Sequence, residues 1–308
     1  MGGCYVCSYN PLTMKIGITG ITGLIGRTVA SLARERGHEV IGFTRQPVRG
    51  GAGTRKFSIE EVPDVSGCDA IVNLAGESVL GLWTPGKRRA IRESRVLGTR
   101  RIVEAIRRTS KPPQVLVNGS AIGFYGDTGE TVTEETALHG SKFLAQVCVA
   151  WEAETLPVQE AGVRVPLLRT GMVLAREGGA LAAMLPAFKL GLGGKLGNGR
   201  QWVSWIHIED QAALVLAAVE NETIHGPVNG TAPNPVRNEE FTQALAEKVG
   251  RPAWFRVPAL ALRLATGGFS AELLESRRIV PAAAAKAGFA FRFPELRGAL
   301  DDLLGDKK

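Results

Sequence analysis

The sequence predicts an α/β fold in which a doubly wound parallel sheet precedes a smaller, mostly helical region. Short apolar runs alternate with longer amphipathic stretches from Met14 to about residue 225, a pattern typical of repeated strand–helix–strand units. A glycine-rich turn, Gly20 to Gly26, joins the first apolar run to the first amphipathic stretch. After Gly226 the pattern changes to separate helices linked by proline-containing connectors.

The elements follow from local signals in chain order. Gly20 ends the first strand, Gly37 ends the first helix, and Pro112–Pro113 ends the longest helix. We expect strands at 15–19, 39–44, 55–58 (weak), 68–74, 114–118, 163–168 and 202–208, and helices at 24–36, 86–108, 135–154, 180–190 and 209–220. The stretch 191–199 is too rich in glycine for regular structure and is interpreted as either a substrate lid or a surface loop.

Length and composition divide the chain into three parts. The 308 residues are 44% hydrophobic and 22% charged, as in globular proteins. We expect a ragged extension at 1–13, a dinucleotide-binding domain at 14–225 and a substrate or partner region at 226–308. No apolar run approaches the roughly 18 residues of a membrane span.

Charge and cysteine content narrow the classes of partner. The net charge is +7, and many arginines fall within 88–108, which we interpret as a solvated helix face. No aromatic residues interleave with them, so nucleic acid is not an expected partner. The four cysteines indicate neither a metal site nor a disulfide scaffold, and no secretory signal is apparent, so a cytoplasmic location is expected.

The turn from Gly20 to Gly26 predicts a dinucleotide site in a Rossmann-like domain. Glycines let the backbone turn tightly and approach a pyrophosphate, and the helix N-terminus offers free N–H groups to it. The residues expected to contact the cofactor here are Gly20, Thr22, Gly23, Leu24, Ile25 and Gly26. Thr44 and Arg45 end the second strand where an acid would bind the ribose of NAD(H). Arginine there favours the 2′-phosphate of NADP(H), and Arg49 or Arg55 could assist.

Several motifs resemble those of the extended short-chain dehydrogenase/reductase superfamily. More specifically, the chain resembles its atypical epimerase-like branch, whose members are labelled nucleoside-diphosphate-sugar epimerase or cell-division-inhibitor-like protein. The supporting stretches are 20–26, 73–78, 119–126, 151–152, 168–171, 188–194 and 205–210, and 258–304 resembles the small C-terminal domain of that branch. The resemblance implies cofactor contacts at Leu74, Ala75 and Gly76. Glu77 is either a further contact or a helix-terminal acid.

The same resemblance exposes a gap in the catalytic residues. It places Ser120 where a serine polarises the substrate, although the spacing to Tyr125 departs by one residue, so a structural hydrogen bond is the alternative. It places Leu144 and Cys148 where a tyrosine and a lysine serve as acid/base and cation, and neither can do that chemistry. Tyr125 is expected to pack rather than react, and Arg169 to pair with an interior acid in preference to a substrate anion.

Two functions remain open from the sequence. The first is an NADP(H)-dependent oxidoreductase or epimerase with an altered proton relay, acting on a small polar molecule, with a homodimer left open. The second is a non-catalytic NADP(H)-dependent sensor or scaffold, in which the C-terminal region binds a partner. No metal is expected in either case.

Overall fold

A seven-stranded parallel sheet forms the centre of the computed structural model, which describes residues 13–46, 53–135 and 139–305. The strand order is β12-β7-β5-β4-β1-β2-β3, so the winding reverses between β1 and β4. The strands are β1 (Lys15–Thr19), β2 (Glu39–Thr44), β3 (Thr54–Lys56), β4 (Ala70–Asn73), β5 (Val115–Ala121), β7 (Pro166–Thr170) and β12 (Gly226–Gly230). The predicted α/β sheet is confirmed, and its switch point is where such sheets bind ligands.

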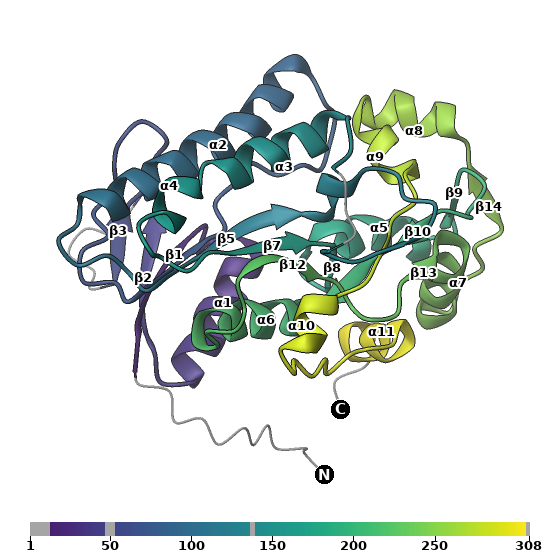
Figure 1. The fold of residues 1–308 in the computed structure, drawn as a ribbon. Coiled ribbons are helices and arrows are strands. Elements are labelled where there is room, and N and C mark those ends of the chain that lie inside the picture. Colours follow the sequence, from purple (N-terminus) through teal and green to yellow (C-terminus); the bar gives the residue numbers. More distant parts are fainter. Residues whose placement is uncertain (1–12, 47–52, 136–138, 306–308) are drawn as a thin grey trace, which may run out of the picture.

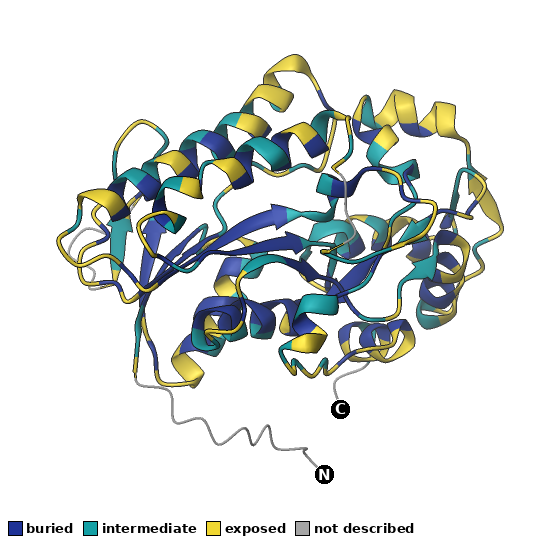
Figure 2. Ribbon diagram, in the orientation of Figure 1, coloured by how far each residue is buried: buried dark blue, intermediate teal, exposed yellow. Residues whose placement is uncertain are grey.

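Helices cover both faces of the sheet (Figure 1). One face carries α2 (Pro85–Arg108), α3 (Phe143–Ala153) and α4 (Leu156–Gln159), and the other carries α1 (Leu24–Glu35) and α6 (Ile208–Glu220). The central strands are buried, as Figure 2 shows. Their side chains feed two separate apolar clusters, one around Ile18 and Leu214 and the other around Ile71 and Ile102. Burial on both faces explains why these strands are continuous apolar runs in the sequence.

The C-terminal part lies beside the carboxyl ends of the strands (Figure 1). Its helices are α7 (Asn238–Val249), α8 (Ala259–Thr266), α9 (Phe269–Leu274), α10 (Ala282–Lys286) and α11 (Leu296–Leu304), and α5 (Gly179–Lys189), from earlier in the chain, shares an apolar cluster with α7 and α11. Short strand pairs lie outside the main sheet, and three of them join a strand before β12 to a strand after it. The pairs are β8 (Met172–Ala175) with β11 (Trp205–His207), β9 (Gly194–Leu196) with β14 (Phe255–Val257), β10 (Trp202–Val203) with β13 (Val236–Arg237), and β6 (Thr131–Val132) with β15 (Arg278–Ile279). Among the described residues, no helix combines the length and apolarity needed to cross a membrane.

The structure differs from two sequence predictions at places where a glycine allows two backbone segments to lie in close contact. The helix expected at 135–154 begins only at Phe143, because Gly140 packs against Gly126 and a Cβ at Gly140 would lie 2.8 Å from the Gly126 Cα. The stretch 191–199 does contain regular structure, since β9 pairs with β14. A Cβ at Gly194 would lie 2.3 Å from the Phe255 carbonyl oxygen, so the glycine permits a strand contact rather than preventing one.

Two further boundaries differ for reasons of long-range pairing. The strand expected at 202–208 is split at Ser204, whose hydroxyl donates to the Arg277 carbonyl at 2.7 Å and accepts from the Ile279 N–H at 2.8 Å. The expected division between residues 225 and 226 stays a prediction, but the edge strand β12 lies just beyond it and pairs with β7. The sheet therefore extends to Gly230.

Candidate functional site

The glycine turn forms a cradle at the carboxyl end of β1. Gly20 has φ of +67°, which favours glycine, and a Cβ there would lie 2.8 Å from the Leu74 carbonyl oxygen. A Cβ at Gly26 would lie only 2.2 Å from the Gly20 carbonyl oxygen, so the helix packs directly on the turn. The N-cap residue of α1 is Gly23, so no side chain hydrogen-bonds the first N–H groups of the helix. The first turn of the helix also contains no acidic residue. The N–H groups at Leu24, Ile25 and Gly26 therefore stay available to an anion.

Neutral polar side chains fix the strand ends beneath this cradle. The Thr19 hydroxyl donates to Asn73 Oδ1 at 2.7 Å and accepts the N–H groups of Leu74 and Ala75, each at 3.1 Å. Asn73 Nδ2 donates to Asn118 Oδ1 at 2.7 Å. These buried bonds hold the ends of β1, β4 and β5 in register, so the Leu74–Gly76 turn lies beside Gly20.

The end of β2 places an unpaired cation beside the cradle. Arg45 is exposed and makes no hydrogen bond or ion pair with any residue that the structure describes, whereas Arg55 holds the carbonyls of Asp64 and Ser66. Thr44 is half-buried, and its hydroxyl accepts from Gln46. Arg49 lies outside the described residues. Of the two described arginines, Arg45 is the one whose guanidinium has no hydrogen-bond partner among the described residues.

A second, more buried guanidinium lies at the Gly76 backbone. A Cβ at Gly76 would be 3.1 Å from Arg95 Cζ, and Arg95 Nη1 donates to the carbonyls of Glu77 and Ile91 at 2.9 and 3.1 Å. Burial lowers the pKa of Arg95 from its usual range. The Glu77 carboxylate is engaged by Lys87 at 2.5 Å, so no carboxylate within the described residues hydrogen-bonds Arg95. Among the described residues, the partners of the Arg95 guanidinium are therefore two backbone carbonyls and the face of the Trp151 ring at 5.3 Å, with no carboxylate.

Ser120 belongs to a buried ionic network. Its hydroxyl donates to Glu152 Oε1 at 2.6 Å, and Glu152 accepts both Nε and Nη2 of Arg169 at 2.9 and 2.8 Å. Arg169 Nη1 donates to the Tyr125 hydroxyl at 3.0 Å, and that hydroxyl donates to Asn229 Oδ1 at 2.6 Å. Arg169 therefore pairs with an interior acid, as expected. Burial raises the pKa of Tyr125, so the phenol stays protonated and fully hydrogen-bonded.

The positions aligned with the catalytic tyrosine and lysine hold apolar contacts. Leu144 packs on the backbone of Gly123, where a Cβ would be 3.1 Å from the Leu144 Cβ. Cys148 is buried, its Sγ lies 3.7 Å from the Ala121 carbonyl oxygen, and burial raises its pKa to about 11. The thiol is therefore protonated at neutral pH and supplies no cation.

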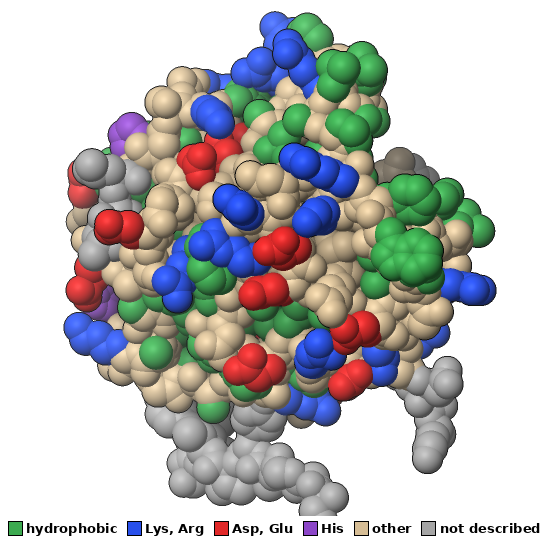
Figure 3. All heavy atoms as spheres, turned by 90° about the vertical axis from the view of Figure 1, so that its right-hand side faces the viewer, with side chains coloured by type: hydrophobic (Ala, Val, Ile, Leu, Met, Phe, Trp, Pro, Cys, Tyr) green, Lys and Arg blue, Asp and Glu red, His purple; other side chains and the backbone are tan. Residues whose placement is uncertain are grey.

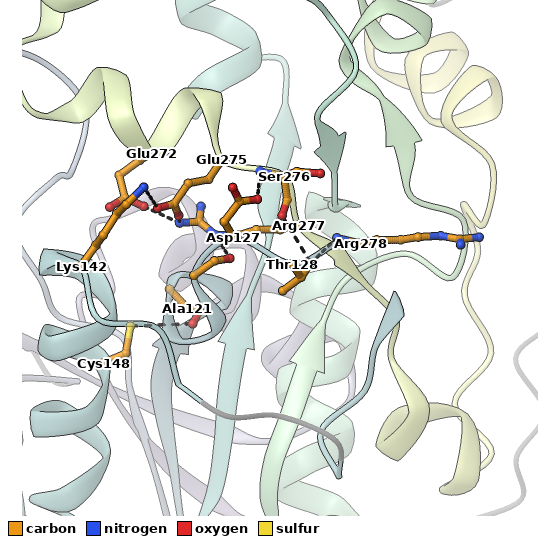
Figure 4. A network of polar contacts seen from close by, with 11 residues as sticks. Ala121, Asp127, Thr128, Lys142, Cys148, Glu272, Glu275, Ser276, Arg277 and Arg278 are labelled. Atoms are coloured by element: carbon orange, nitrogen blue, oxygen red, sulfur yellow. Dashed lines mark hydrogen bonds and ion pairs between the residues drawn. The ribbon is translucent and has the colours of Figure 1, made fainter. Parts of the chain in front are cut away.

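A polar pocket of about 620 Å³ lies between the loop after β5 and the segment before β15. Lys142 reaches Glu275 at 2.6 Å, while Arg277 contacts Glu275 and Glu272 and donates to the Gly126 carbonyl at 3.1 Å (Figure 4). The pocket lining includes Tyr125, Asp127, Thr128, His139, Lys142 and Glu275. Its hydroxyls and charges suit a small polar molecule. No cluster of His, Cys, Asp and Glu suited to a metal occurs in the described part of the chain.

Sequence reasoning missed two residues of this site. Arg95 was grouped with a solvated helix face, but it shares the inward face of α2 with Ile91 and Ile102, four residues before it and seven after it. That spacing is the signal that distinguishes it from its neighbours. Glu152, on α3, is recognisable from the sequence only as a motif residue, and nothing local predicts its pairing with Ser120 on β5 and Arg169 on β7.

Comparison with family models assigns both parts of the chain. Residues 16–229 match the NAD dependent epimerase/dehydratase family, and residues 257–303 match a domain of unknown function, DUF1731. The resemblance inferred from the motifs, including the separate C-terminal domain, is confirmed.

Relatives with the same organisation occur in plants, bacteria and animals. "Epimerase family protein SDR39U1 homolog, chloroplastic" of Arabidopsis thaliana is 36% identical over 93% of this chain and 86% of its own length, and "Epimerase family protein YfhF" of Bacillus subtilis is 36% identical over 96% and 99%. The crystal structure of human SDR39U1 with NADPH superposes with a TM-score of 0.88 at 32% identity, covering 95% of this chain and all of that one. The UDP-N-acetylglucosamine 4-epimerase of Bacillus cereus, at 18% identity and a TM-score of 0.75 over 94% and 98%, shares the fold. This chain belongs to the NAD dependent epimerase/dehydratase family.

Proposed function

We propose that this protein binds NADP(H) at the carboxyl edge of its sheet and acts as an oxidoreductase or epimerase on a small polar molecule. The observation that carries the proposal is the cradle at Gly20–Gly26, where added Cβ atoms would collide with backbone and where the N–H groups of α1 have no side-chain cap. The NADPH in the human SDR39U1 structure supports the same cofactor here. The polar pocket next to Tyr125 would take the substrate.

The residues that would hold the cofactor come from three strand ends. Those assigned to it are Gly20, Thr22, Gly23, Leu24, Ile25, Gly26, Thr44, Arg45, Leu74, Ala75, Gly76 and Glu77. Backbone N–H groups of the first turn bind the pyrophosphate. Arg45 pairs with the 2′-phosphate, because its guanidinium has no competing carboxylate among the described residues, and this favours NADP(H) over NAD(H).

Arg95 takes over the cationic role of the absent lysine. Cys148 carries no charge, whereas the Arg95 guanidinium lies at the Gly76 backbone and hydrogen-bonds no carboxylate among the described residues. It would donate to a ribose oxygen in the nicotinamide half of the cofactor. An ion of this kind is better satisfied when the ligand is bound, so the cation contributes to affinity rather than to the stability of the empty protein.

Ser120 and Glu152 move the proton. The cofactor, when bound, accepts or returns the hydride at its nicotinamide. As a substrate hydroxyl becomes a carbonyl, its proton passes to Ser120 Oγ while the Ser120 proton passes to Glu152 Oε1, 2.6 Å away. Returning the same proton along the same bond reverses the step, which an epimerase requires. Arg169 holds Glu152 in this position through two hydrogen bonds, at 2.9 and 2.8 Å.

Fluorescence titration with NADPH and NADH tests cofactor binding. We expect Arg45→Ala to weaken NADPH binding by about 10–100-fold and leave NADH binding unchanged, because a charged bidentate contact contributes about 1.5–3 kcal/mol. Arg95→Ala should weaken both cofactors about equally, and Arg92→Ala, on the exposed side of α2, should change neither. Equal affinity of the wild type for both cofactors, unaffected by Arg45→Ala, would refute the NADP(H) preference.

Turnover is tested with 4-deuterated NADPH and a panel of sugar nucleotides and small carbonyl compounds. Label transfer that is lost in Ser120→Ala and retained in Cys148→Ala supports the Ser120 relay. Tight NADPH binding without label transfer across the panel instead supports the sensor or scaffold, which the apolar contacts of Leu144 and Cys148 favour. The cytoplasmic location and the homodimer stay predictions, and light scattering after gel filtration tests the second.

A further inference from the structure

An exposed apolar surface surrounds β14 and α8, away from the residues assigned to cofactor and substrate. We call it the β14–α8 surface and define it by Leu190, Leu192, Trp254, Phe255, Leu260 and Leu264. Trp254 is 89% exposed, Leu264 77% and Leu190 74%. Single exposed apolar residues are common, but a tryptophan, a phenylalanine and four leucines in three neighbouring segments are not.

Two of the three segments are held side by side by backbone pairing, and the third follows in the chain. β14 runs parallel to β9 with Phe255 opposite Gly194, so Leu192 and Trp254 lie just before two adjacent strands. α8 follows β14 directly after Pro258, and only Leu262 of this helix is buried. Figure 3 shows the apolar side chains of this face in two areas, with basic side chains beside them. The face is thus fixed in shape, which suits a large, flat partner rather than a small ligand.

The segment that carries β14 and α8 has charge of one sign. Arg251, Arg256 and Arg263 are exposed, and no acidic residue occurs between positions 251 and 270. The Arg256 guanidinium anchors part of the surface by donating to the Gly197 carbonyl at 2.6 Å, while the side chains of Arg251 and Arg263 make no hydrogen bond or ion pair with any residue the structure describes. A partner must therefore present both an apolar layer and negative charge.

We propose that the β14–α8 surface docks the protein on the surface of an anionic phospholipid membrane. Trp and Phe insert favourably at the boundary between headgroups and acyl chains, and arginines next to them pair with lipid phosphates. A second copy of the chain fits less well, because a symmetric contact would bring Arg251 and Arg263 against their own copies with no acid in the segment to offset them. The docking is peripheral and reversible, and it is independent of the proposed reaction.

Co-flotation of the full chain with vesicles tests the proposal. Vesicles of phosphatidylcholine alone are compared with vesicles containing one-third phosphatidylglycerol, at low and at 0.5 M salt. We expect the protein to float with the anionic vesicles at low salt and to remain in solution with the neutral ones, because each arginine near an anionic surface contributes about fivefold to binding. High salt should release it.

Two variants, each with a matched control, locate the contact. Arg251→Glu with Arg263→Glu should lower binding by about 30-fold or more, whereas Arg92→Glu with Arg107→Glu, which changes the net charge equally on α2, should leave it within about twofold. Trp254→Ser with Leu264→Ser should lower binding at least about tenfold, whereas Leu156→Ser, at a residue 53% exposed on α4, should not. Retained NADPH fluorescence and an unchanged melting temperature show that the variants are folded.

Three results would overturn the proposal. The first is a wild-type chain that stays in solution with anionic vesicles at low salt. The second is flotation that the surface variants leave unchanged, which would place the contact elsewhere. The third is a dimer that dissociates in the Trp254→Ser and Leu264→Ser variant while no vesicle binding is seen, which would assign the surface to a second copy.

Discussion

The proposed site has two parts, a cofactor side at the glycine cradle and a substrate side at Ser120, and different interactions stabilise them. The cofactor side consists of glycine backbone and neutral side chains, with Thr19 and Asn73 bridging neighbouring strands at 2.7 Å. The substrate side rests on a buried ion pair, Glu152 with Arg169, to which Ser120 is attached. The cofactor side depends on close contact between backbone segments, whereas the substrate side depends on a buried carboxylate being paired with a buried guanidinium.

This difference determines how each side tolerates change. A neutral hydrogen bond contributes about 0.5–1.5 kcal/mol to stability. On the cofactor side, the room for an added side chain therefore decides which substitutions are tolerated, more than the loss of a hydrogen bond does. Removing one partner of a buried ion pair leaves an uncompensated charge, which is far more costly. We therefore expect substitutions on the substrate side to act on stability, and those on the cofactor side to act on affinity.

Glu152→Ala should have the largest effect. It leaves buried Arg169 with the Tyr125 hydroxyl and the Phe124 ring as partners and no carboxylate among the described residues, and we expect the free energy of unfolding to fall by about 3–5 kcal/mol. Urea denaturation followed by circular dichroism measures the change. The exposed Lys56–Glu61 pair provides the control, since Glu61→Ala should cost less than about 1 kcal/mol. Similar losses in both variants would show that the ionic network does not distinguish the two sides.

Gly26→Ala should come next and should act mainly on binding. The new Cβ would lie 2.2 Å from the Gly20 carbonyl oxygen, so the turn must move, and overpacking of this kind costs about 1–3 kcal/mol. We expect NADPH affinity to fall by about 10–100-fold in a fluorescence titration. Gly298→Ala is the control, because its Cβ would meet open space on α11, and it should leave affinity unchanged. Undiminished NADPH affinity in Gly26→Ala would contradict the cradle.

The smallest expected effect concerns His207, at the N-terminus of α6. Burial lowers its pKa to about 4 despite Asp302 at 3.3 Å, with Arg292 also lowering it. Since the unfolded chain binds a proton at this residue below about pH 6.5 and the folded chain does not, stability should fall as the pH drops from 6.5 to 4, by about 2 kcal/mol. His207→Asn keeps a side-chain acceptor for the helix cap and should flatten that slope in urea titrations. An equally steep slope in the variant would assign the pH dependence to other groups.

The sequence predicts the strand–turn–helix geometry of the glycine cradle well because its determinants are local. Gly20, Gly23 and Gly26 occupy one turn, and the strand before and helix after them are visible as patterns. The substrate side was predicted only in part, because Glu152, Arg169 and Tyr125 meet through contacts between residues far apart in the chain. Arg95 is a third case. Its helical spacing from the buried residues of α2 indicates that it faces inward, but it lies within a run of arginines that is interpreted as a solvated face.

The pairing of β6 with β15 affects the order in which the chain folds during synthesis on the ribosome. Thr131 lies opposite Arg278, so the loop after β5 obtains its strand partner only after almost 150 further residues have been synthesised. The cradle at Gly20 and its supports at Asn73 and Asn118 are all synthesised before residue 120. We therefore expect the nascent chain to acquire its nucleotide-binding half early, and to assemble the pocket beside Tyr125 only after release of the C-terminal segment.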